Sequence, residues 1–424
     1  VDGSLVLGLN AGFGAGKTTF LNMWESDLRS RREKGDFPPM PLFLNAWESD
    51  YCGDPLLAIL ASLIDALDEW NVKGKTAETS ALKEAIKDVA CFTLALGNGV
   101  AAKLTGIDLM KAADSTVEKQ NARKPQRPDF IELYHQRADA LKALKIELAK
   151  TFGGESPKIL VFVDELDRCR PDYAVSYLET IKHVFDVRGM VFVLAIDYEH
   201  LANSAKALFG QDLVFEEYFR KFCHRTINLP EPDEAAYWKL SKAYVSKYLA
   251  VEGKRQSLLP TDRHFLDNIV KLAYGFKMPP RQIQEGFRIL GHTMVAGDPK
   301  QAGQISPALG ACTLLLCFLR VARSEVYKKI SKGDHSLVVV GEQLVAAMGK
   351  DDAEWWVQLY FTGTVEGDVS KSPIEQALRE LGYIKDGSFD IHAYMKGFSS
   401  GWGYQSRQNS VSRICRMIDS ADAF

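Results

Sequence analysis

The sequence lacks the features that mark several large classes of protein. Its seven cysteines include no C-x-x-C pair and no cysteine and histidine set at zinc spacing, which argues against a zinc module. Basic side chains number 52 and acidic ones 55, so the net charge of −3 gives no sign of a protein that coats nucleic acid. Reduced thiols and first residues without an export signal predict a cytoplasmic protein.

The chain also has no long, uninterrupted hydrophobic run. Residues 89–102 are too few to cross a bilayer, and residues 301–319 are interrupted by Gln304, Ser306, Pro307 and Gly310. We expect both segments to be buried helices, and we expect no membrane span. Apolar residues make up 46% of the 424 residues, which suits a folded chain with at least two compact units.

Short, continuous apolar runs alternate with segments of helical periodicity. The predicted strands are residues 5–9, 41–46, 159–163, 190–196 and 226–229. The predicted helices between them are residues 17–32, 55–70, 172–185 and 199–208. Continuous apolar strands separated by helices indicate a parallel sheet that is covered on both faces. We therefore predict an α/β fold with about five strands.

The helical segments outside this alternation define the expected domains. Residues 77–152 contain no strand-like run and are predicted to be a helical insertion, with a basic, proline-containing connector at residues 122–128. The sheet domain is expected to span residues 1–232. Only helical periodicity follows, which predicts a helical lid at residues 233–295 and a C-terminal helical domain at residues 296–424.

A glycine-rich turn follows the first predicted strand. Residues 11–19 read Ala-Gly-Phe-Gly-Ala-Gly-Lys-Thr-Thr, the end of the phosphate-binding pattern G-x-x-x-x-G-K-[ST], with Ala11 in its first position. Glycines let successive amide N–H groups converge on phosphate oxygens, and the start of a helix adds a favourable dipole. The alternative is an ordinary turn. The predicted phosphate-binding residues are Gly12, Phe13, Gly14, Ala15, Gly16, Lys17, Thr18 and Thr19.

Three of these residues have specific expected roles. Lys17 is predicted to reach the β and γ phosphates, and the Thr18 hydroxyl to ligate Mg²⁺. Thr19 is expected to order the α-phosphate. The predicted cofactors are ATP and Mg²⁺.

Two acids end the apolar run at residues 159–163. Charge is costly there unless a cation or a reacting water lies beside it. Asp164 is predicted to hold Mg²⁺, and Glu165 to orient or deprotonate the water that attacks the γ-phosphate. The alternative for such an acid is a helix N-cap.

Four further segments resemble the KAP family of P-loop NTPases. They are Asn45-Ala-Trp47, Asp164-Glu-Leu-Asp-Arg-Cys169 followed by Pro171, Leu194-Ala-Ile-Asp197, and Tyr218-Phe-Arg-Lys221 leading to Leu229-Pro230. The resemblance spans roughly residues 5–288. It implies a P-loop NTPase sheet with an insertion between the two motifs, and a family with bacterial members tied to phage exclusion. This chain looks like a soluble bacterial member, and Glu165 replaces an aspartate often found there.

The resemblance also implies roles for residues outside the two motifs. Asp197 occupies a sensor-like position that could read the γ-phosphate, with a strand-end cap as the alternative. Arg281 looks like a residue that reaches the phosphates from the second domain. Candidates for an arginine finger supplied by another copy, each otherwise a surface ion pair, are Arg168, Arg220, Lys221 and Arg225. Cys169 is expected to be a small buried residue rather than a nucleophile.

Together these patterns predict Mg²⁺-dependent ATP hydrolysis that drives a conformational or assembly change. The resemblance to the KAP family implies that the chain is the ATPase component of a bacterial antiphage defence system. One alternative is a nucleotide-gated switch with negligible hydrolysis. Another is a DNA-stimulated ATPase that would use basic clusters at residues 29–34 and 123–127. The expected partners are ATP, a protein of a defence system and further copies of this chain; the net charge does not support nucleic acid. Residues 394–404 are expected to form a partner surface or core packing.

Overall fold

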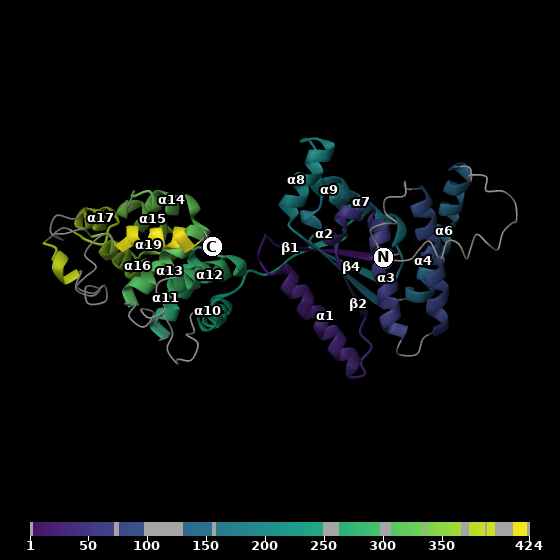
Figure 1. The fold of residues 1–424 in the computed structure, drawn as a ribbon, viewed down its shortest axis with the longest axis horizontal. Coiled ribbons are helices and arrows are strands. Elements are labelled where there is room, and N and C mark those ends of the chain that lie inside the picture. Colours follow the sequence, from purple (N-terminus) through teal and green to yellow (C-terminus); the bar gives the residue numbers. More distant parts are fainter. Residues whose placement is uncertain are drawn as a thin grey trace. The chain divides into compact units, whose positions relative to one another are not determined.

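The computed structural model describes residues 3–71, 76–96, 130–154, 158–248, 263–296, 307–334, 336–365, 373–385, 388–394 and 410–421. The chain divides into two compact units, Val1–Leu229 and Pro230–Phe424 (Figure 1). Each unit has a hydrophobic core of its own, so each is described by itself.

The first unit is built on a parallel sheet of five strands, as predicted. Their order across the sheet is β2-β3-β4-β1-β5. The strands are β1 (Leu5–Asn10), β2 (Met40–Asn45), β3 (Ile159–Asp164), β4 (Met190–Ile196) and β5 (Arg225–Asn228). Every residue of β3 and β4 is buried, which explains why these two central strands are apolar throughout instead of alternating.

Two separate layers of side chains cover the sheet. Leu160 and Phe162 of β3 pack with Leu21 and Leu28 of α1 (Lys17–Glu33). The alternate residues of β3 belong instead to the larger core on the other face, because successive strand side chains point to opposite faces. That core also takes residues from α3 (Pro55–Asn71), α7 (Pro171–Val184), α8 (Tyr198–Phe209) and α9 (Phe215–Phe219).

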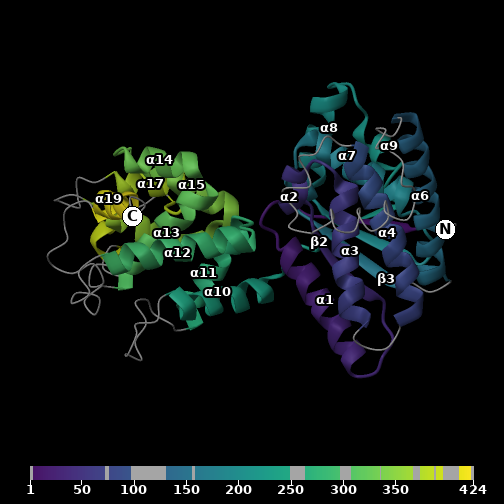
Figure 2. The ribbon, with the colours of Figure 1, turned by 45° about the vertical axis from the view of Figure 1, so that its right-hand side comes forward.

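The predicted insertion supplies two long helices, α4 (Thr76–Leu96) and α6 (Phe130–Phe152). They lie side by side and α4 also packs on α3, as Figures 1 and 2 show. Leu82, Ile86 and Leu144 are fully buried in the same core as α3, so the insertion is part of the first unit. The basic connector at residues 122–128 and the end of the apolar run at residues 97–102 lie outside the described residues.

The second unit is helical. Its helices are α10 (Glu234–Tyr248), α11 (Arg263–Gly275), α12 (Pro280–Ala296), α13 (Pro307–Ala322), α14 (Ser324–Ser331), α15 (Leu337–Met348), α16 (Lys350–Gly363), α17 (Ile374–Glu380) and α19 (Ser410–Ala421). One core runs through the residues expected for the lid and those expected for the C-terminal domain. Trp356 on α16, for example, donates its indole N–H to the backbone oxygen of Asn268 on α11, at 3.2 Å.

The apolar segment at residues 301–319 is buried where it is described. Helix α13 carries five consecutive fully buried residues between Leu315 and Leu319, as expected for a helix inside a core. Within the described ranges, no helix combines the length and the apolar character that a membrane crossing requires. Of the predicted partner surface at residues 394–404, only Tyr394 belongs to the described chain.

Candidate functional site

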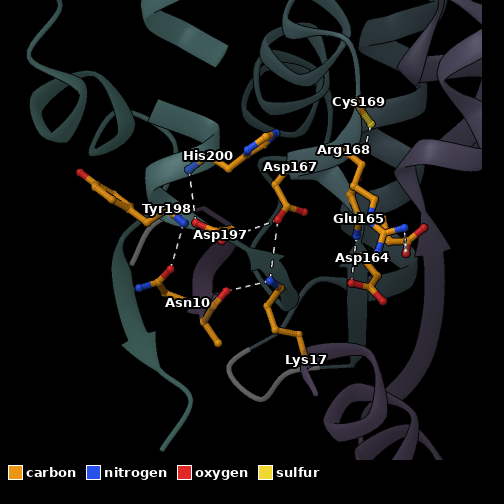
Figure 3. Close-up of polar contacts among 11 residues, drawn as sticks. Asn10, Lys17, Asp164, Glu165, Asp167, Arg168, Cys169, Asp197, Tyr198 and His200 are labelled. Atoms are coloured by element: carbon orange, nitrogen blue, oxygen red, sulfur yellow. Dashed lines mark hydrogen bonds and ion pairs between the residues drawn. The ribbon is translucent and has the colours of Figure 1, made fainter. Parts of the chain in front are cut away.

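The candidate site lies at the carboxyl ends of the central strands. β1, β3 and β4 are neighbours in a parallel sheet, so the residues that follow each of them meet at one edge. These residues are the phosphate loop after β1, Asp164 and Glu165 at the end of β3, and Asp197 after β4 (Figure 3). Asn45 of β2 pairs in register with Asp164 and joins the same edge.

The phosphate loop is a tight turn between β1 and α1. The Ala11 N–H donates to the backbone oxygen of Ile196 at 3.1 Å, which fixes the entrance of the loop to β4. Gly14 and Gly16 have φ angles of 78° and 99°, a left-handed conformation that glycine adopts readily. Helix α1 begins immediately afterwards at Lys17, so its first amide N–H groups and its dipole face the loop, an arrangement that suits an anion.

Lys17 is held near the centre of the site. Its ammonium donates to the backbone oxygen of Ala11 at 2.7 Å and lies 3.7 Å from a carboxylate oxygen of Asp167. A cation that is largely removed from water needs such partners. Both contacts keep the ammonium beside the loop whose amide groups would bind phosphate.

Asp164 is 2% exposed and accepts the Glu165 N–H at 2.9 Å. Its predicted alternative role, a helix cap, is not what the structure shows, because the next α-helix is α7 and its N-cap residue is Arg170. A short 3₁₀ turn at Leu166–Arg168 comes between them. The buried carboxylate of Asp164 therefore does not cap the α-helix that follows β3.

Glu165 has an uncommon backbone and two side-chain partners. Its φ angle is 59°, a left-handed value that is rare for a residue other than glycine. One carboxylate oxygen accepts from the Asn45 side-chain amide at 3.3 Å, and the other lies 3.0 Å from a guanidinium nitrogen of Arg168. The backbone turn brings the carboxylate to the end of β2 as well as to β3.

Asp197 is the N-cap residue of α8. Its carboxylate accepts the His200 N–H at 3.2 Å, which is the strand-end cap that the sequence left open. Its own N–H donates to Asp167 at 3.0 Å, and the neighbouring Tyr198 N–H donates to Asn10 at 2.9 Å. These bonds fix the start of α8 to the site, and the sensor role of Asp197 stays a prediction.

Three residues of the site had no role assigned from the sequence. Asp167 links Lys17 to Asp197, Asn45 contacts Glu165, and Asn10 holds the start of α8 while donating to Asn228 on β5. Asp167 has a signal in the sequence, since it comes three residues after Asp164 and so lies one 3₁₀ turn further on. Each asparagine is the last residue of a strand.

Cys169 is buried beside the acids of the site. Burial, and then the charges of Asp50, Asp167 and Glu165, raise the pKa of its thiol to about 12. The thiol therefore stays protonated at neutral pH, which agrees with the expectation of a small buried residue rather than a nucleophile.

Other predicted positions have local partners or lie elsewhere. Arg29 and Arg31 of the first basic cluster form ion pairs with Glu25, Glu69 and Asp36, which fits a solvated surface. Of the finger candidates, Arg220 forms an ion pair with Glu216, and Lys221 lies over the Tyr218 ring. Arg225 is the first residue of β5. Arg281 lies in the first turn of α12, in the second unit, and its role stays a prediction.

Comparisons with known proteins place the chain in a family. The model of the KAP family P-loop domain matches residues 2–294. A segment of 58 residues is 36% identical to an uncharacterized protein of Methanocaldococcus jannaschii, and it spans 14% of this chain and 30% of that protein. The solved structures that are similar include the Aeropyrum pernix ORC2 protein in its ADP form and in its ADPNP–ADP complexes.

Both ORC2 structures are 13% identical to this chain and are matched over 99% of it. The ADP form is covered over 86% of its own length with a TM-score of 0.33, and the ADPNP–ADP complexes over 87% with a TM-score of 0.35. The family match is the more informative finding, because it covers the sheet, the phosphate loop and both acids at the end of β3. The chain belongs to the KAP family of P-loop nucleotide-binding proteins.

Proposed function

We propose that the chain hydrolyses ATP with the help of Mg²⁺, and that Glu165 activates the attacking water. One observation carries this proposal: the phosphate loop with Lys17 and the two acids at the end of β3 meet at one edge of the sheet (Figure 3). A simple nucleotide store would gain nothing from a second carboxylate beside the γ-phosphate, because like charges repel.

The groups present suit a triphosphate and a magnesium ion. The loop supplies backbone N–H groups and the ammonium of Lys17, and Thr18 and Asp164 supply the hard oxygen ligands that Mg²⁺ prefers. In the described part of the chain, His, Cys, Asp and Glu side chains form no group of three that could hold a metal alone. The pair of Thr18 and Asp164 fits Mg²⁺, because this ion takes one or two protein carboxylates and completes its shell with phosphate oxygens and water. When bound, the ion would neutralise charge on the phosphates.

The residues of the chain have separate tasks in the proposed reaction. The loop amides and Lys17 hold the β and γ phosphates and offset the charge that develops on them. The water oxygen bonds to the γ-phosphorus while the bond to the bridging β-γ oxygen breaks. One proton of the water passes to a carboxylate oxygen of Glu165. In the structure these two oxygens contact Asn45 and Arg168.

We propose that a change of the bound nucleotide from ATP to ADP alters the rest of the chain through the contacts of Asp167. This carboxylate joins Lys17 to the start of α8, so a change at the phosphates that moves Lys17 also changes a contact of Asp197. Asp197 and, from the second unit, Arg281 would then act as sensors of the γ-phosphate. Arg281→Gln should leave ADP affinity unchanged and weaken ATP affinity relative to the wild type, and an ATP affinity equal to that of the wild type would remove Arg281 from the proposal.

A nucleotide-gated switch is the second candidate function. The observation that favours it is that Lys17 and both carboxylate oxygens of Glu165 already have partners within the protein. Such contacts would make unstimulated hydrolysis slow. In this version, ATP binding rather than turnover would change how the second unit is presented to a partner.

We propose that the chain takes part in bacterial defence against phage. It would act in the cytoplasm, bind a protein partner and assemble with further copies of itself. The support for this proposal is the KAP family alone, so it needs a test in cells. Expression of the gene in a bacterial host should lower the plating efficiency of at least some phages, and Lys17→Ala should restore it. Equal plating efficiency on cells that express the wild type and the Lys17→Ala variant would show that ATP hydrolysis by this chain has no role in defence against phage.

Phosphate release by the purified protein tests the proposed chemistry. We expect turnover that stops when EDTA removes Mg²⁺ and that is lost in Glu165→Gln. A series of protein concentrations shows whether assembly stimulates the rate, and an arm with DNA tests the DNA-stimulated alternative. Nucleotide binding without any turnover in all arms would instead favour the switch.

A further inference from the structure

Arg168, one of the candidates for an arginine finger, contacts Glu165, Phe13 and Trp47 within its own chain. It ends the 3₁₀ turn after Glu165, and a guanidinium nitrogen lies 3.0 Å from a carboxylate oxygen of Glu165 (Figure 3). The centre of the guanidinium lies 5.1 Å from the middle of the Phe13 ring and 5.6 Å from that of the Trp47 ring. One side chain therefore contacts the phosphate loop, the segment after β2 and the proposed base.

The two aromatic rings occupy exposed positions. Phe13 is 60% exposed and Trp47 is 51% exposed, although rings of this size are usually buried. A guanidinium over an aromatic face gains a cation–π attraction and has fewer free rotamers. The Arg168 and Glu165 side chains are only 33% and 20% exposed, so their ion pair is less screened by water than a pair on the open surface.

These contacts decide where the Glu165 carboxylate points. Asn45 engages one of its oxygens and Arg168 the other. In Figure 3 the carboxylate is turned toward Arg168, on the side of Asp164 that is away from Lys17. A carboxylate in this orientation has to leave Arg168 before it can accept a proton from a water held at the γ-phosphate.

We propose that Arg168 is a positioning residue that holds Glu165 away from the attacking water, with Phe13 and Trp47 as the platform that keeps Arg168 in place. The proposal rests on the proposed ATPase function. Because Phe13 belongs to the phosphate loop, the restraint is connected to the loop that would bind nucleotide. Arg168 thus limits the basal rate and makes it depend on the conformation of that loop.

Steady-state hydrolysis by Arg168→Gln tests this inference. The variant keeps a polar side chain but lacks the charge that binds Glu165, so kcat should rise about two- to fivefold, the factor expected for loss of one partly exposed ion pair. KM for ATP should stay within a factor of about two, since no phosphate contact is removed. Arg168→Lys retains the charge without the planar stacking, and its kcat should lie between those of Arg168→Gln and the wild type.

Arg170→Gln is the matched control. Arg170 forms an ion pair of the same length, 3.0 Å, but with Asp50, which has no proposed task. Its kcat should equal that of the wild type. The double variant Arg168→Gln with Glu165→Gln should be as slow as Glu165→Gln alone, because the gain acts through Glu165. A kcat for Arg168→Gln that is unchanged or lower, with Arg170→Gln at the wild-type rate, would overturn the proposal.

Hydrogen exchange gives a second readout that needs no hydrolysis. Arg168→Gln should speed exchange in the peptides that contain Glu165 and Phe13, and Arg170→Gln should not. If Arg168→Gln speeds exchange but the wild-type protein never turns over ATP, the restraint of Glu165 by Arg168 is supported and the proposed ATPase function is refuted. If turnover depends on Glu165 but neither rate nor exchange changes in Arg168→Gln, the ATPase function is supported and the restraint is refuted.

Discussion

The ammonium of Lys17 lies 3.7 Å from a carboxylate oxygen of Asp167, and this contact joins the phosphate loop to the turn after β3. The same oxygen accepts the N–H of Asp197 at 3.0 Å. A single buried carboxylate therefore connects the ends of β1, β3 and β4. Its removal should affect the fold of the site as well as its electrostatics.

Asp167→Ala is expected to lower the free energy of unfolding by about 1–3 kcal/mol, because the Asp197 N–H loses its acceptor in a buried place. Asp167→Asn keeps an acceptor oxygen of the same shape and should cost less than the alanine variant. Urea unfolding of both variants beside the wild type measures the difference. Equal stability of the alanine and asparagine variants would show that the hydrogen bond to Asp197 does not contribute to the free energy of unfolding.

The conformation of the phosphate loop predicts that alanine substitutions at two of its glycines have different effects on stability. Gly16 has a φ of 99°, so Gly16→Ala should cost about 1–2 kcal/mol of stability, the strain of a side chain in a left-handed conformation. At Gly12 an added methyl group meets no atom within 4 Å and φ is not left-handed, so Gly12→Ala should stay within about 0.5 kcal/mol of the wild type. Unfolding of the two variants without nucleotide compares them directly, and similar losses for both would contradict the loop geometry.

The two central strands, β3 and β4, could be predicted well because their burial has a direct signature in the sequence. All seven residues of β4 are buried between two layers, and only a continuous apolar run can satisfy such a position. Lys17 and Asp164 were predicted as site residues because phosphate-binding and Mg²⁺-binding sites use those residue types after particular strands, and their roles stay predictions. Both kinds of inference depend on neighbours in the sequence.

Contacts between distant segments could not be predicted in this way. Nothing local indicates that Arg168 meets the Phe13 and Trp47 rings, or that Glu165 adopts a left-handed backbone. The same holds for the second unit, where periodicity suggested a lid and a separate domain. Side chains such as Trp356 instead join the two segments in one core, and helical periodicity does not tell which helices share a core.

Acid should weaken the first unit through Asp186. Burial opposes its ionisation, but hydrogen bonds from Ser4 and the charge of Lys182 hold the pKa of Asp186 below its usual value. A depressed pKa stabilises the fold above the unfolded value of about 3.9 and loses this effect as the pH falls through the folded value.

Asp186→Asn should therefore be less stable than the wild type at about pH 6, and the difference should shrink as the pH falls below about 3.9 toward about pH 2. Urea unfolding at the two pH values measures this. Asp139→Asn is the control, because Asp139 pairs with Lys142 on the exposed surface of α6, and the loss of such a pair should change stability little at either pH. A difference of the same size at both pH values would exclude the ionised carboxylate as the cause.

Thiol labelling tests the electrostatics around the site. Since the pKa of Cys169 is raised to about 12 and its side chain is buried, iodoacetamide at about pH 8 should leave Cys169 unmodified in the folded protein. The partly exposed Cys52 should be alkylated first. Mass spectrometry of the digested protein identifies the modified thiols, and rapid labelling of Cys169 would mean that the turn after β3 opens readily.

The central claim is that the two acids at the end of β3 serve hydrolysis at the phosphate loop. Measuring ATP binding and phosphate release together for the wild type and Glu165→Gln tests it most directly. We expect both proteins to bind ATP with similar affinity, and phosphate release by the variant to fall by about 10²-fold or more, the usual contribution of a general base. Wild-type turnover that persists unchanged in Glu165→Gln would contradict the account.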